Sequence, residues 1–426
     1  MFHKHFKSGC IVLTLLLSTL LAHADEVSDH IAAARDYMAD KQWSYANYEW
    51  RAALEKDPKN LEATLGLAQS LNSGGYLKES IEFLQKSRPT PPLSIIDLTL
   101  AQDYQQAGDP LSACDIYESL LTRDRYNPDI YKGGSALLSS LPKDRKDKLT
   151  AELDAAASES LKKAQDALNA KQYADAAQYY EIPVNYFKTL NIVNDYGLAL
   201  LLSGQNQKAY QQFNVLTNQK VHHWLLNANS ALADLSVGNT GQAVSQMEKA
   251  IGQCNNVKAK ARLYNDLGFL YERSRRFMNA RHAYEHALQL DPSLLKAQYN
   301  LGYILQKSQE YKEALAVYNN LIAQNPNNAE AWNSLGFTYE LMDKEKPALA
   351  AYQKAIEINP RYKEAYFNMG ALYKKMDKTA NSAEAYKHVS EIQFQEIEKP
   401  QLSTEPEGQA KILKYVDVFY SKEAES

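Results

Sequence analysis

Asparagine recurs at regular intervals in the carboxy-terminal half of this sequence, at Asn265, Asn300, Asn333 and Asn368. An asparagine amide offers both a hydrogen-bond donor and an acceptor, so it can satisfy the C=O and N–H of a peptide unit whatever side chain that unit carries. A regular series of such amides could therefore hold the backbone of an extended polypeptide. This is the chemistry of binding, and it needs no reactive group.

Side chains that could support catalysis or metal binding are few. His282 and His286 lie four residues apart, so on a helix both imidazoles would share one face. A zinc site needs at least a third protein ligand, and we interpret both histidines as surface residues. The sequence contains no phosphate-binding loop, no zinc-protease helix motif, no Cys-x-x-Cys and no Gly-x-Ser-x-Gly. We therefore predict no catalytic residue, no cofactor and no metal site.

Regularly spaced small residues indicate the elements that must position the asparagines. Between Ala329 and Pro360 the sequence predicts two amphipathic helices, with Gly336 and Ala348 facing each other where the helices cross. Tyr352 would fill the space between this pair and the next. One such pair cannot bury its own apolar face, so it needs neighbours stacked on both sides.

The same columns recur when the chain is aligned on Ala329 as position 1 of a 34-residue unit. Position 8 is Gly or Ala, position 20 is Ala or Ser, and position 24 is large and apolar in all ten units. The units begin near Val27, Leu61, Ser94, Ala157, Leu190, Trp224, Ala261, Leu295, Ala329 and Lys363. Chance composition does not produce this pattern ten times in register, so we predict an all-α solenoid of ten or eleven helix pairs.

The unit from Ala329 resembles a tetratricopeptide repeat (TPR). Trp332, Leu335, Gly336 and Tyr339 follow the pattern W-x2-L-G-x2-Y, and a proline closes the unit. The resemblance implies a right-handed TPR superhelix in which the first helix of each pair lines a concave groove. Ligands of such proteins, usually extended peptides or a partner's helix, lie along that groove. The groove positions implied are 2, 5, 6, 9, 12 and 13.

Groove positions in the most regular repeats, residues 261–396, combine amides, aromatic rings and lysines. One asparagine per repeat resembles the asparagine ladders of some TPR superhelices, although asparagine could also simply fill a polar inner face. The aromatic rings would form an apolar floor, and the lysines would attract an acidic partner. The predicted partner-binding residues are Asn265, Phe269, Lys296, Tyr299, Asn300, Tyr303, Lys307, Asn333, Phe337, Phe367, Asn368 and Lys374.

Residues 1–24 have the pattern of a signal peptide. Lys4 and Lys7 precede an apolar run from Ile11 to Leu21, and Ala22-His23-Ala24 is an A-x-A cleavage site. The apolar run is too short to span a bilayer comfortably, and an uncleaved membrane anchor is the alternative. We expect a mature chain that starts at Asp25, is exported to the periplasm or the periphery of the outer membrane, and has no integral membrane span.

Charge and cysteine content constrain the partners and the cross-links of the mature chain. Loss of Lys4 and Lys7 leaves 45 basic and 51 acidic residues, a net charge of about −6, which argues against nucleic acid as a partner. Cys114 and Cys254 lie four repeats apart, whereas a disulfide needs Cα atoms within ~7 Å. We predict two free, packed thiols.

The regular pattern weakens between residues 128 and 156. Asp147 falls where position 20 should be small, so the tight helix crossing is lost. We predict an amino-terminal array over 25–127, a degenerate pair or bend over 128–156, and a carboxy-terminal array over 157–396. Pro183 is expected to interrupt the second helix of the unit that begins at Ala157.

The end of the sequence combines a polar linker, 397–410, with a terminal segment, 411–426. Ile412, Leu413, Val416, Phe419 and Tyr420 would lie on one stripe of a helix. The segment could cap the last repeat. Alternatively, it could be a detachable segment that lies in the groove or docks on a partner.

These observations favour a non-enzymatic protein-interaction scaffold of the bacterial cell envelope, for example in assembly of a pilus, secretion or polysaccharide-export complex. The alternative is a regulatory or recruiting subunit of an enzyme that acts on peptidoglycan or polysaccharide.

Overall fold

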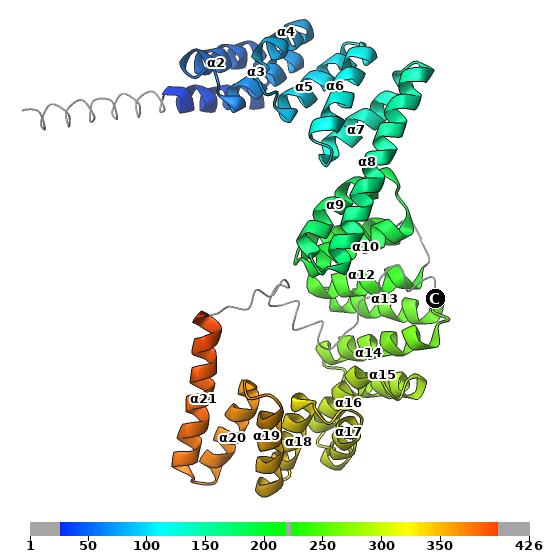
Figure 1. Ribbon diagram of the computed structural model, residues 1–426, viewed down its shortest axis with the longest axis vertical. Coiled ribbons are helices and arrows are strands. Elements are labelled where there is room, and N and C mark those ends of the chain that lie inside the picture. The colour runs from blue at the N-terminus through cyan, green and yellow to red at the C-terminus, as the bar shows by residue number, and fades with distance from the viewer. Residues whose placement is uncertain (1–25, 219–222, 399–426) are drawn as a thin grey trace, which may run out of the picture. The chain divides into compact units, whose positions relative to one another are not determined.

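The computed structural model describes residues 26–218 and 223–398, and these residues form helices and turns without a strand (Figure 1). Consecutive helices pack as pairs, and the pairs stack in sequence order. The chain is therefore an all-α solenoid, as the column pattern predicted. It divides into two compact units, Met1–Lys162 and Lys163–Ser426.

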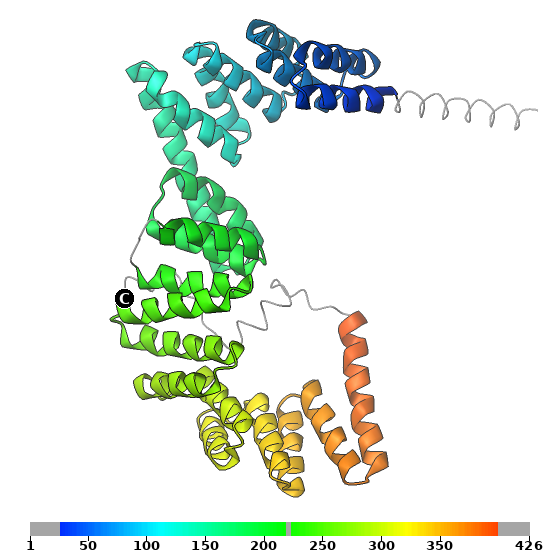
Figure 2. The same cartoon turned by 180° about the vertical axis from the view of Figure 1, so that it is seen from behind.

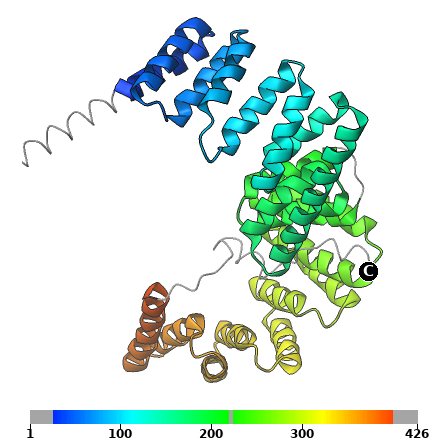
Figure 3. The ribbon, with the colours of Figure 1, turned by 45° about the horizontal axis from the view of Figure 1, so that its top comes forward.

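The first unit contains three regular helix pairs and an irregular end, and Figure 3 shows the regular pairs side by side. It opens with a helix over residues 26–39. The helices that follow are α2 (Trp43–Lys56), α3 (Leu61–Ser73), α4 (Leu77–Ser87), α5 (Ser94–Gln106), α6 (Pro110–Arg123), α7 (Pro128–Leu137), η1 (Leu138–Ser140) and the start of α8 (Lys143–Asn169).

The second unit begins within α8 and is itself a stack of helix pairs, seen from the other side in Figure 2. Its further helices are α9 (Tyr173–Tyr186), α10 (Leu190–Leu202), α11 (Asn206–Asn218), α12 (Trp224–Ser236), α13 (Thr240–Gln253), α14 (Val257–Arg273), α15 (Phe277–Leu290), α16 (Leu295–Lys307), α17 (Tyr311–Gln324), α18 (Ala329–Leu341), α19 (Glu345–Ile358), α20 (Lys363–Lys375) and α21 (Thr379–Glu398).

Most first helices begin at the residue where the column alignment starts a unit. This holds for α3, α5, α10, α12, α16, α18 and α20. α14 instead begins at Val257, four residues before the expected Ala261. The reason is a helix cap, because the Asn256 side chain accepts a hydrogen bond from Ala259 N at 2.9 Å.

The small residue at position 8 allows the ring at position 24 to lie against the backbone of the first helix. A Cβ placed on Gly268 would come within 2.5 Å of the Tyr284 ring, and one on Gly302 within 2.7 Å of Tyr318. Tyr284 and Tyr318 are both fully buried. These glycines are therefore required by close packing of the two helices in each pair.

The hydroxyl of the position-24 tyrosine is usually satisfied by the residue at position 12 of the same repeat. Tyr117 donates to Gln105 Oε1 at 2.9 Å, and Tyr352 donates to Glu340 Oε2 at 2.7 Å. In the repeat that starts at Ala157, position 12 is a leucine, and the Tyr180 hydroxyl has no hydrogen-bond partner among the described residues.

The turn inside each pair has one fixed conformation. Position 15 has a positive φ in all ten repeats, between 55° and 88°. This left-handed conformation ends the first helix and reverses the chain. Glycine accommodates it without strain in four repeats. The ten residues are Lys41, Gly75, Gly108, Lys171, Gly204, Gly238, Arg275, Gln309, Asp343 and Asp377.

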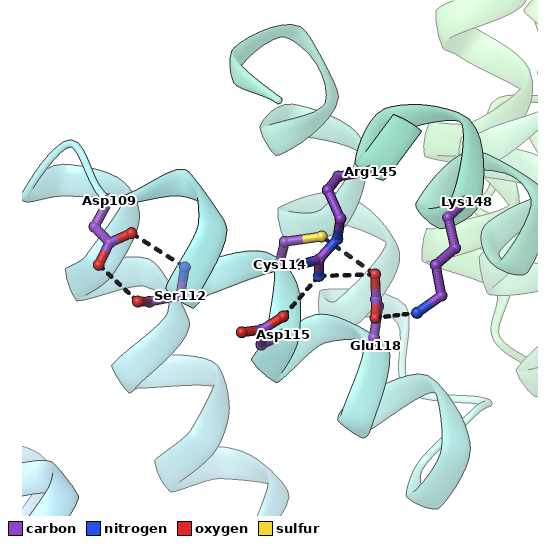
Figure 4. A network of polar contacts seen from close by, with 7 residues as sticks. All are labelled: Asp109, Ser112, Cys114, Asp115, Glu118, Arg145 and Lys148. Carbon is purple, nitrogen blue, oxygen red and sulfur yellow. Dashed lines mark hydrogen bonds and ion pairs between the residues drawn. The ribbon is translucent and has the colours of Figure 1, made fainter. Parts of the chain in front are cut away.

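Charged contacts replace tight packing where the repeat pattern fails. Arg145 Nη2 lies 2.6 Å from Asp115 Oδ1 and 3.0 Å from Glu118 Oε1, and Lys148 Nζ lies 2.6 Å from Glu118 Oε2 (Figure 4). Burial alone would raise the pKa of Glu118, but the hydrogen bonds from Lys148 and Arg145 outweigh it and hold that pKa below its ordinary value. These ion pairs join α8 to α6 beside Asp147.

Helix α8 differs from the sequence prediction. A new unit was expected to begin at Ala157, but α8 runs without a break through 27 residues, and the two units divide at Lys162 and Lys163. Residues 143–169 contain no glycine or proline and are rich in Ala, Leu and Lys, which are strong helix formers. Nothing in this stretch therefore ends the helix.

Pro183 also differs from the prediction, because α9 continues through it to Tyr186. The proline ring is buried between neighbouring residues of the stack, and this packing outweighs the lost backbone hydrogen bond.

The proposed leader, most of the linker after Glu398 and the segment 411–426 lie outside the described residues. Within the described part, no helix has the length and apolar character needed to cross a bilayer.

Replacing Gly268 with alanine should lower the free energy of unfolding by about 1–3 kcal/mol, because the new Cβ overlaps the buried Tyr284 ring. Gly252 lies inside α13, and the position that a Cβ would take there has no neighbouring atom within 4 Å. Gly252→Ala is therefore the matched control and should be neutral or stabilising by up to ~1 kcal/mol. Urea unfolding followed by circular dichroism measures both, and equal effects would contradict the packing argument.

Two tyrosine-to-phenylalanine changes should have opposite effects on stability. Tyr352→Phe removes the hydrogen bond to Glu340 and should cost about 1–2 kcal/mol. Tyr180→Phe removes a buried hydroxyl without a described partner and should be neutral or stabilising. Thermal unfolding of the two variants beside the parent chain provides the comparison. A larger loss of stability for Tyr180→Phe than for Tyr352→Phe would show that the residue at position 12 does not satisfy the tyrosine hydroxyls.

Candidate functional site

The predicted groove residues differ widely in exposure. Asn265, Phe269 and Asn300 are buried, with exposed fractions of 0%, 7% and 3%. Lys296, Tyr299, Tyr303, Asn333 and Asn368 are partly buried. The exposed members of the set are Lys307, Phe337, Phe367 and Lys374.

The asparagines bond to one another across neighbouring repeats. Asn300 Nδ2 donates to Asn265 Oδ1 at 2.8 Å, and Asn368 Nδ2 donates to Asn333 Oδ1 at 3.0 Å. In each pair, position 5 of one first helix meets position 6 of the next. The same link occurs between Asn194 and Asn229 at 2.8 Å, which the sequence reasoning did not single out.

These pairs give the asparagines a role within the stack, and their role toward a partner stays a prediction. Asn265 and Asn300 are buried and join α14 to α16. A buried amide–amide hydrogen bond fixes how two repeats are placed side by side, since breaking it leaves a desolvated donor and acceptor. The sequence signal for the pairing is an asparagine at position 5 followed by one at position 6 of the next unit, 35 residues later.

Two exposed aromatic side chains lie on the helices that the Asn333–Asn368 hydrogen bond joins. Phe337 is one helical turn beyond Asn333 in α18, and Phe367 directly precedes Asn368 in α20. The Phe337 side chain is 40% exposed and the Phe367 side chain 55%. Phe367 also contacts the Tyr386 ring, with 5.7 Å between the ring centroids. We call Phe337 and Phe367 the aromatic pair.

Lysines lie on the same first helices as the aromatic pair or on a neighbouring one. Lys374 is exposed on α20, and Lys307 on α16 is held over the Tyr303 ring with Nζ 5.2 Å from the ring centroid. Such a cation–π contact orients the lysine without neutralising its charge. The first helices α16 to α20 therefore present apolar rings and positive charge together, which suits a partner that carries apolar and acidic side chains.

A hollow surface lies in the first unit, where the sequence reasoning proposed no site. A hollow of about 660 Å³ lies between the helix over 26–39 and α3. Trp50 packs beneath Gly66, where a Cβ would come within 2.5 Å of the indole. Arg35 and Glu62 form an ion pair beside the hollow. Its lining residues are Arg35, Met38, Trp50, Leu61, Glu62, Leu65, Gly66 and Gln69.

The groove positions of the repeat could have located this hollow. Leu65, Gln69 and Met38 occupy positions 5, 9 and 12, which are the groove positions implied for the later repeats. The prediction covered only residues 261–396, because those repeats are the most regular.

The residues considered for catalysis or metal binding lie apart from both surfaces. His282 and His286 are exposed on α15, which confirms the surface interpretation. Among the described residues, no group of three His, Cys, Asp or Glu side chains could hold a metal ion. Cys114 and Cys254 are buried free thiols, as predicted. Burial raises the pKa of Cys114 to about 11, so this thiol stays protonated at neutral pH.

Family profiles match the chain in both units. A profile described as "TPR repeat" matches residues 304–343 and 346–377. Profiles described as "Tetratricopeptide repeat" match residues 261–294 and 363–396, and residues 31–94. Among curated proteins, no sequence matches this chain.

Several solved structures are similar to parts of the chain. A tetratricopeptide repeat protein from Parabacteroides merdae is 15% identical, covers 61% of this chain and 98% of its own, and has a TM-score of 0.46. MamA from Desulfovibrio magneticus RS-1 is 22% identical over 40% of this chain and 96% of its own, with a TM-score of 0.37. YrrB, titled a TPR protein with an unusual peptide-binding site, is 23% identical over 42% of this chain and 92% of its own, with a TM-score of 0.34.

Replacing Asn300 with alanine should lower the free energy of unfolding by about 1–3 kcal/mol. The substitution removes the hydrogen bond that the buried side-chain carbonyl of Asn265 accepts from the Asn300 amide. Asn368→Ala is the matched control, since the Asn333–Asn368 pair is only partly buried. Its effect should be smaller, at about 1 kcal/mol or less. Urea unfolding of the two variants tests this, and a larger loss for Asn368→Ala would contradict the role of burial.

Proposed function

The chain is a member of the tetratricopeptide repeat family, and we propose that it is a non-enzymatic scaffold that holds partner proteins in the bacterial cell envelope. The repeats bind by presenting a shaped surface, and the chemistry of that surface selects the partner. A pilus, secretion or polysaccharide-export complex would use such a scaffold to hold its components together during assembly.

The exposure of the aromatic pair is the observation that carries this proposal. Two phenylalanines on neighbouring first helices, 40% and 55% exposed, leave apolar area in water that a partner can bury. Aromatic side chains are frequent anchors of protein interfaces because they bury a large area with little loss of conformational freedom. The favoured partner is an extended segment or helix with apolar side chains that enter between Phe337 and Phe367.

Charge narrows the class of partner. Lys307 and Lys374 add positive charge beside the rings, so acidic residues should flank the apolar anchors of the bound segment. At the rim of an interface, such charges increase the rate of association and the selectivity more than the affinity. The partner is therefore proposed to be a protein with a short apolar and acidic motif.

The proposed compartment depends on the amino-terminal sequence. Residues 1–24 carry the basic, apolar and A-x-A features of an exported precursor. A mature chain that starts at Asp25 would act in the periplasm or at the periphery of the outer membrane. The free, buried state of Cys114 and Cys254 is compatible with that compartment, because neither thiol is presented to an oxidant.

Replacing both Phe337 and Phe367 with alanine should reduce recovery of envelope partners at least tenfold, because the anchors of the interface are lost. The mature chain serves as bait, partners are captured by chemical crosslinking in intact cells, and quantitative mass spectrometry compares the variants. Circular dichroism checks that each variant is folded.

Phe277→Ala is the matched control, since Phe277 has the same 40% exposure as Phe337 but lies on a second helix, α15. Its recovery of partners should equal that of the parent chain. Equal recovery by the double variant and the parent would remove the aromatic pair from the proposal.

A further inference from the structure

The repeat that begins at Trp224 departs from the repeat pattern at two positions of its first helix, α12. Position 11 is Tyr, Leu or Ala in the nine other units, and here it is Asp234. Position 7 is Ala, Leu, Met or Tyr in eight of the nine other units, and here it is Ser230. Both side chains are nevertheless buried, with exposed fractions of 3% and 5%. Because burial of a carboxylate is unfavourable, the requirements of packing do not explain Asp234.

Asp234 and Ser230 line a polar hollow of about 220 Å³ between α11, α12 and α13. α12 packs against both other helices, and it lies beside α13 in Figure 1. Each helix contributes two side chains four residues apart, which share one helical face. Asn239, at the start of α13, completes the lining. The three pairs are Tyr210 and Asn214 from α11, Ser230 and Asp234 from α12, and Gln242 and Gln246 from α13.

Gln246 brings a further hydrogen-bond acceptor to this hollow. The residue is 3% exposed, and its Oε1 has no hydrogen-bond partner among the described residues. A buried acceptor without a donor is unfavourable. A ligand that donates a hydrogen bond would therefore stabilise the arrangement.

The charge of the hollow favours a cationic ligand. Among the described residues that line it, Asp234 is the one charged side chain. Burial raises the pKa of Asp234 to about 6, although a hydrogen bond with Asn239 acts in the opposite direction. Most of the carboxylate is therefore ionised at neutral pH. A buried anion is stabilised by a cation placed beside it.

We propose that this hollow binds a primary ammonium group at the end of an alkyl chain. The two carboxylate oxygens of Asp234 and Oε1 of Gln246 provide three acceptors, which equals the number of N–H donors on an ammonium group. The Tyr210 ring supplies a surface for the alkyl stem and for a cation–π contact. The hollow is smaller than most small-molecule sites, so it suits the end of a ligand, such as an aliphatic diamine or a lysine side chain.

The inference goes beyond the scaffold function and does not depend on it. None of the lining residues occupies a groove position, and the aromatic pair lies on other helices, α18 and α20. A bound ammonium group would join side chains from the repeats that begin at Leu190 and Trp224. Because it binds only where these helices are packed, the ligand should also raise the midpoint of thermal unfolding.

Isothermal titration calorimetry of the mature chain tests the site with two amines, 1,5-diaminopentane and the methylamide of Nα-acetyl-lysine. We expect saturable binding of one molecule per chain, and no binding of 1,5-pentanediol, which has the same carbon chain without a cation. Tighter binding of the lysine derivative would assign the site to a protein side chain, and tighter binding of the diamine would assign it to a small amine. Either order supports an ammonium site.

Substitutions connect the binding to the hollow. Asp234→Leu installs a residue that other repeats carry at position 11, and it should abolish binding while circular dichroism shows a folded chain. Gln246→Leu should weaken binding about tenfold, because a hydrogen bond to a charged group is lost. Gln212→Leu is the matched control, since Gln212 occupies the same position 23 in the preceding repeat and does not line the hollow. Its affinity should equal that of the parent chain.

Asp234→Asn keeps the test decisive if Asp234→Leu disturbs folding, because it removes the charge and nearly preserves the shape of the side chain. The same loss of binding is expected. Equal affinity of the parent chain and the Asp234 and Gln246 variants would overturn the proposal. Failure of both amines to bind, or binding of the diol as tightly as the diamine, would also overturn it, because the site would then have no use for a cation.

Discussion

The close approach of a position-24 ring to a position-8 glycine or alanine is the contact on which the rest of this structure depends. It sets the distance between the two helices of a pair, and thereby the thickness of each layer in the stack. Gly268 and Tyr284 illustrate the constraint, since a single methyl group would overlap the ring. Because the same contact recurs in successive repeats, neighbouring first helices within a unit, such as α16, α18 and α20, lie next to one another.

Polar side chains determine how neighbouring repeats are aligned. The Asn265–Asn300 and Asn194–Asn229 hydrogen bonds join first helices across repeats within the buried interior. Gln306 has a similar role, because it donates to the Ser334 carbonyl at 3.0 Å and to Thr338 Oγ1 at 2.6 Å in the next repeat. Since buried polar groups must be paired, these bonds exclude alternative alignments that apolar packing alone would tolerate. Where the packing pattern fails, near Asp147, ion pairs from Arg145 and Lys148 hold α8 to α6.

The surface chemistry of the inner face changes along the second unit. Leucine and phenylalanine at position 9 are buried on α10, α12 and α14, whereas the aromatic pair on α18 and α20 is exposed. One scaffold can therefore offer surfaces of different availability while keeping the same backbone. In a solenoid each repeat contacts only its neighbours, so the exposure of one inner face can change without unfolding another.

The sequence by itself determined the helices, their pairing and the order of the stack. Small residues at positions 8 and 20 and a large apolar residue at position 24 are local requirements, repeated often enough to identify seven first helices at their starting residue. It also placed Cys114, Cys254, His282 and His286 correctly, since burial follows from position in the repeat. It placed a unit boundary at Ala157, which lies inside the continuous helix α8, and it expected Pro183 to interrupt α9, although the proline is buried within that helix.

Only the tertiary structure decided which inner-face residues are available to a partner. The pairing of Asn265 with Asn300 depends on the distance between two repeats, which no single repeat encodes. The burial of Leu232 and the exposure of Phe337 occur at the same position with similar side chains, so the difference arises from what covers each helix. Long-range contacts of this kind depend on the whole stack, and a periodic sequence cannot specify them repeat by repeat.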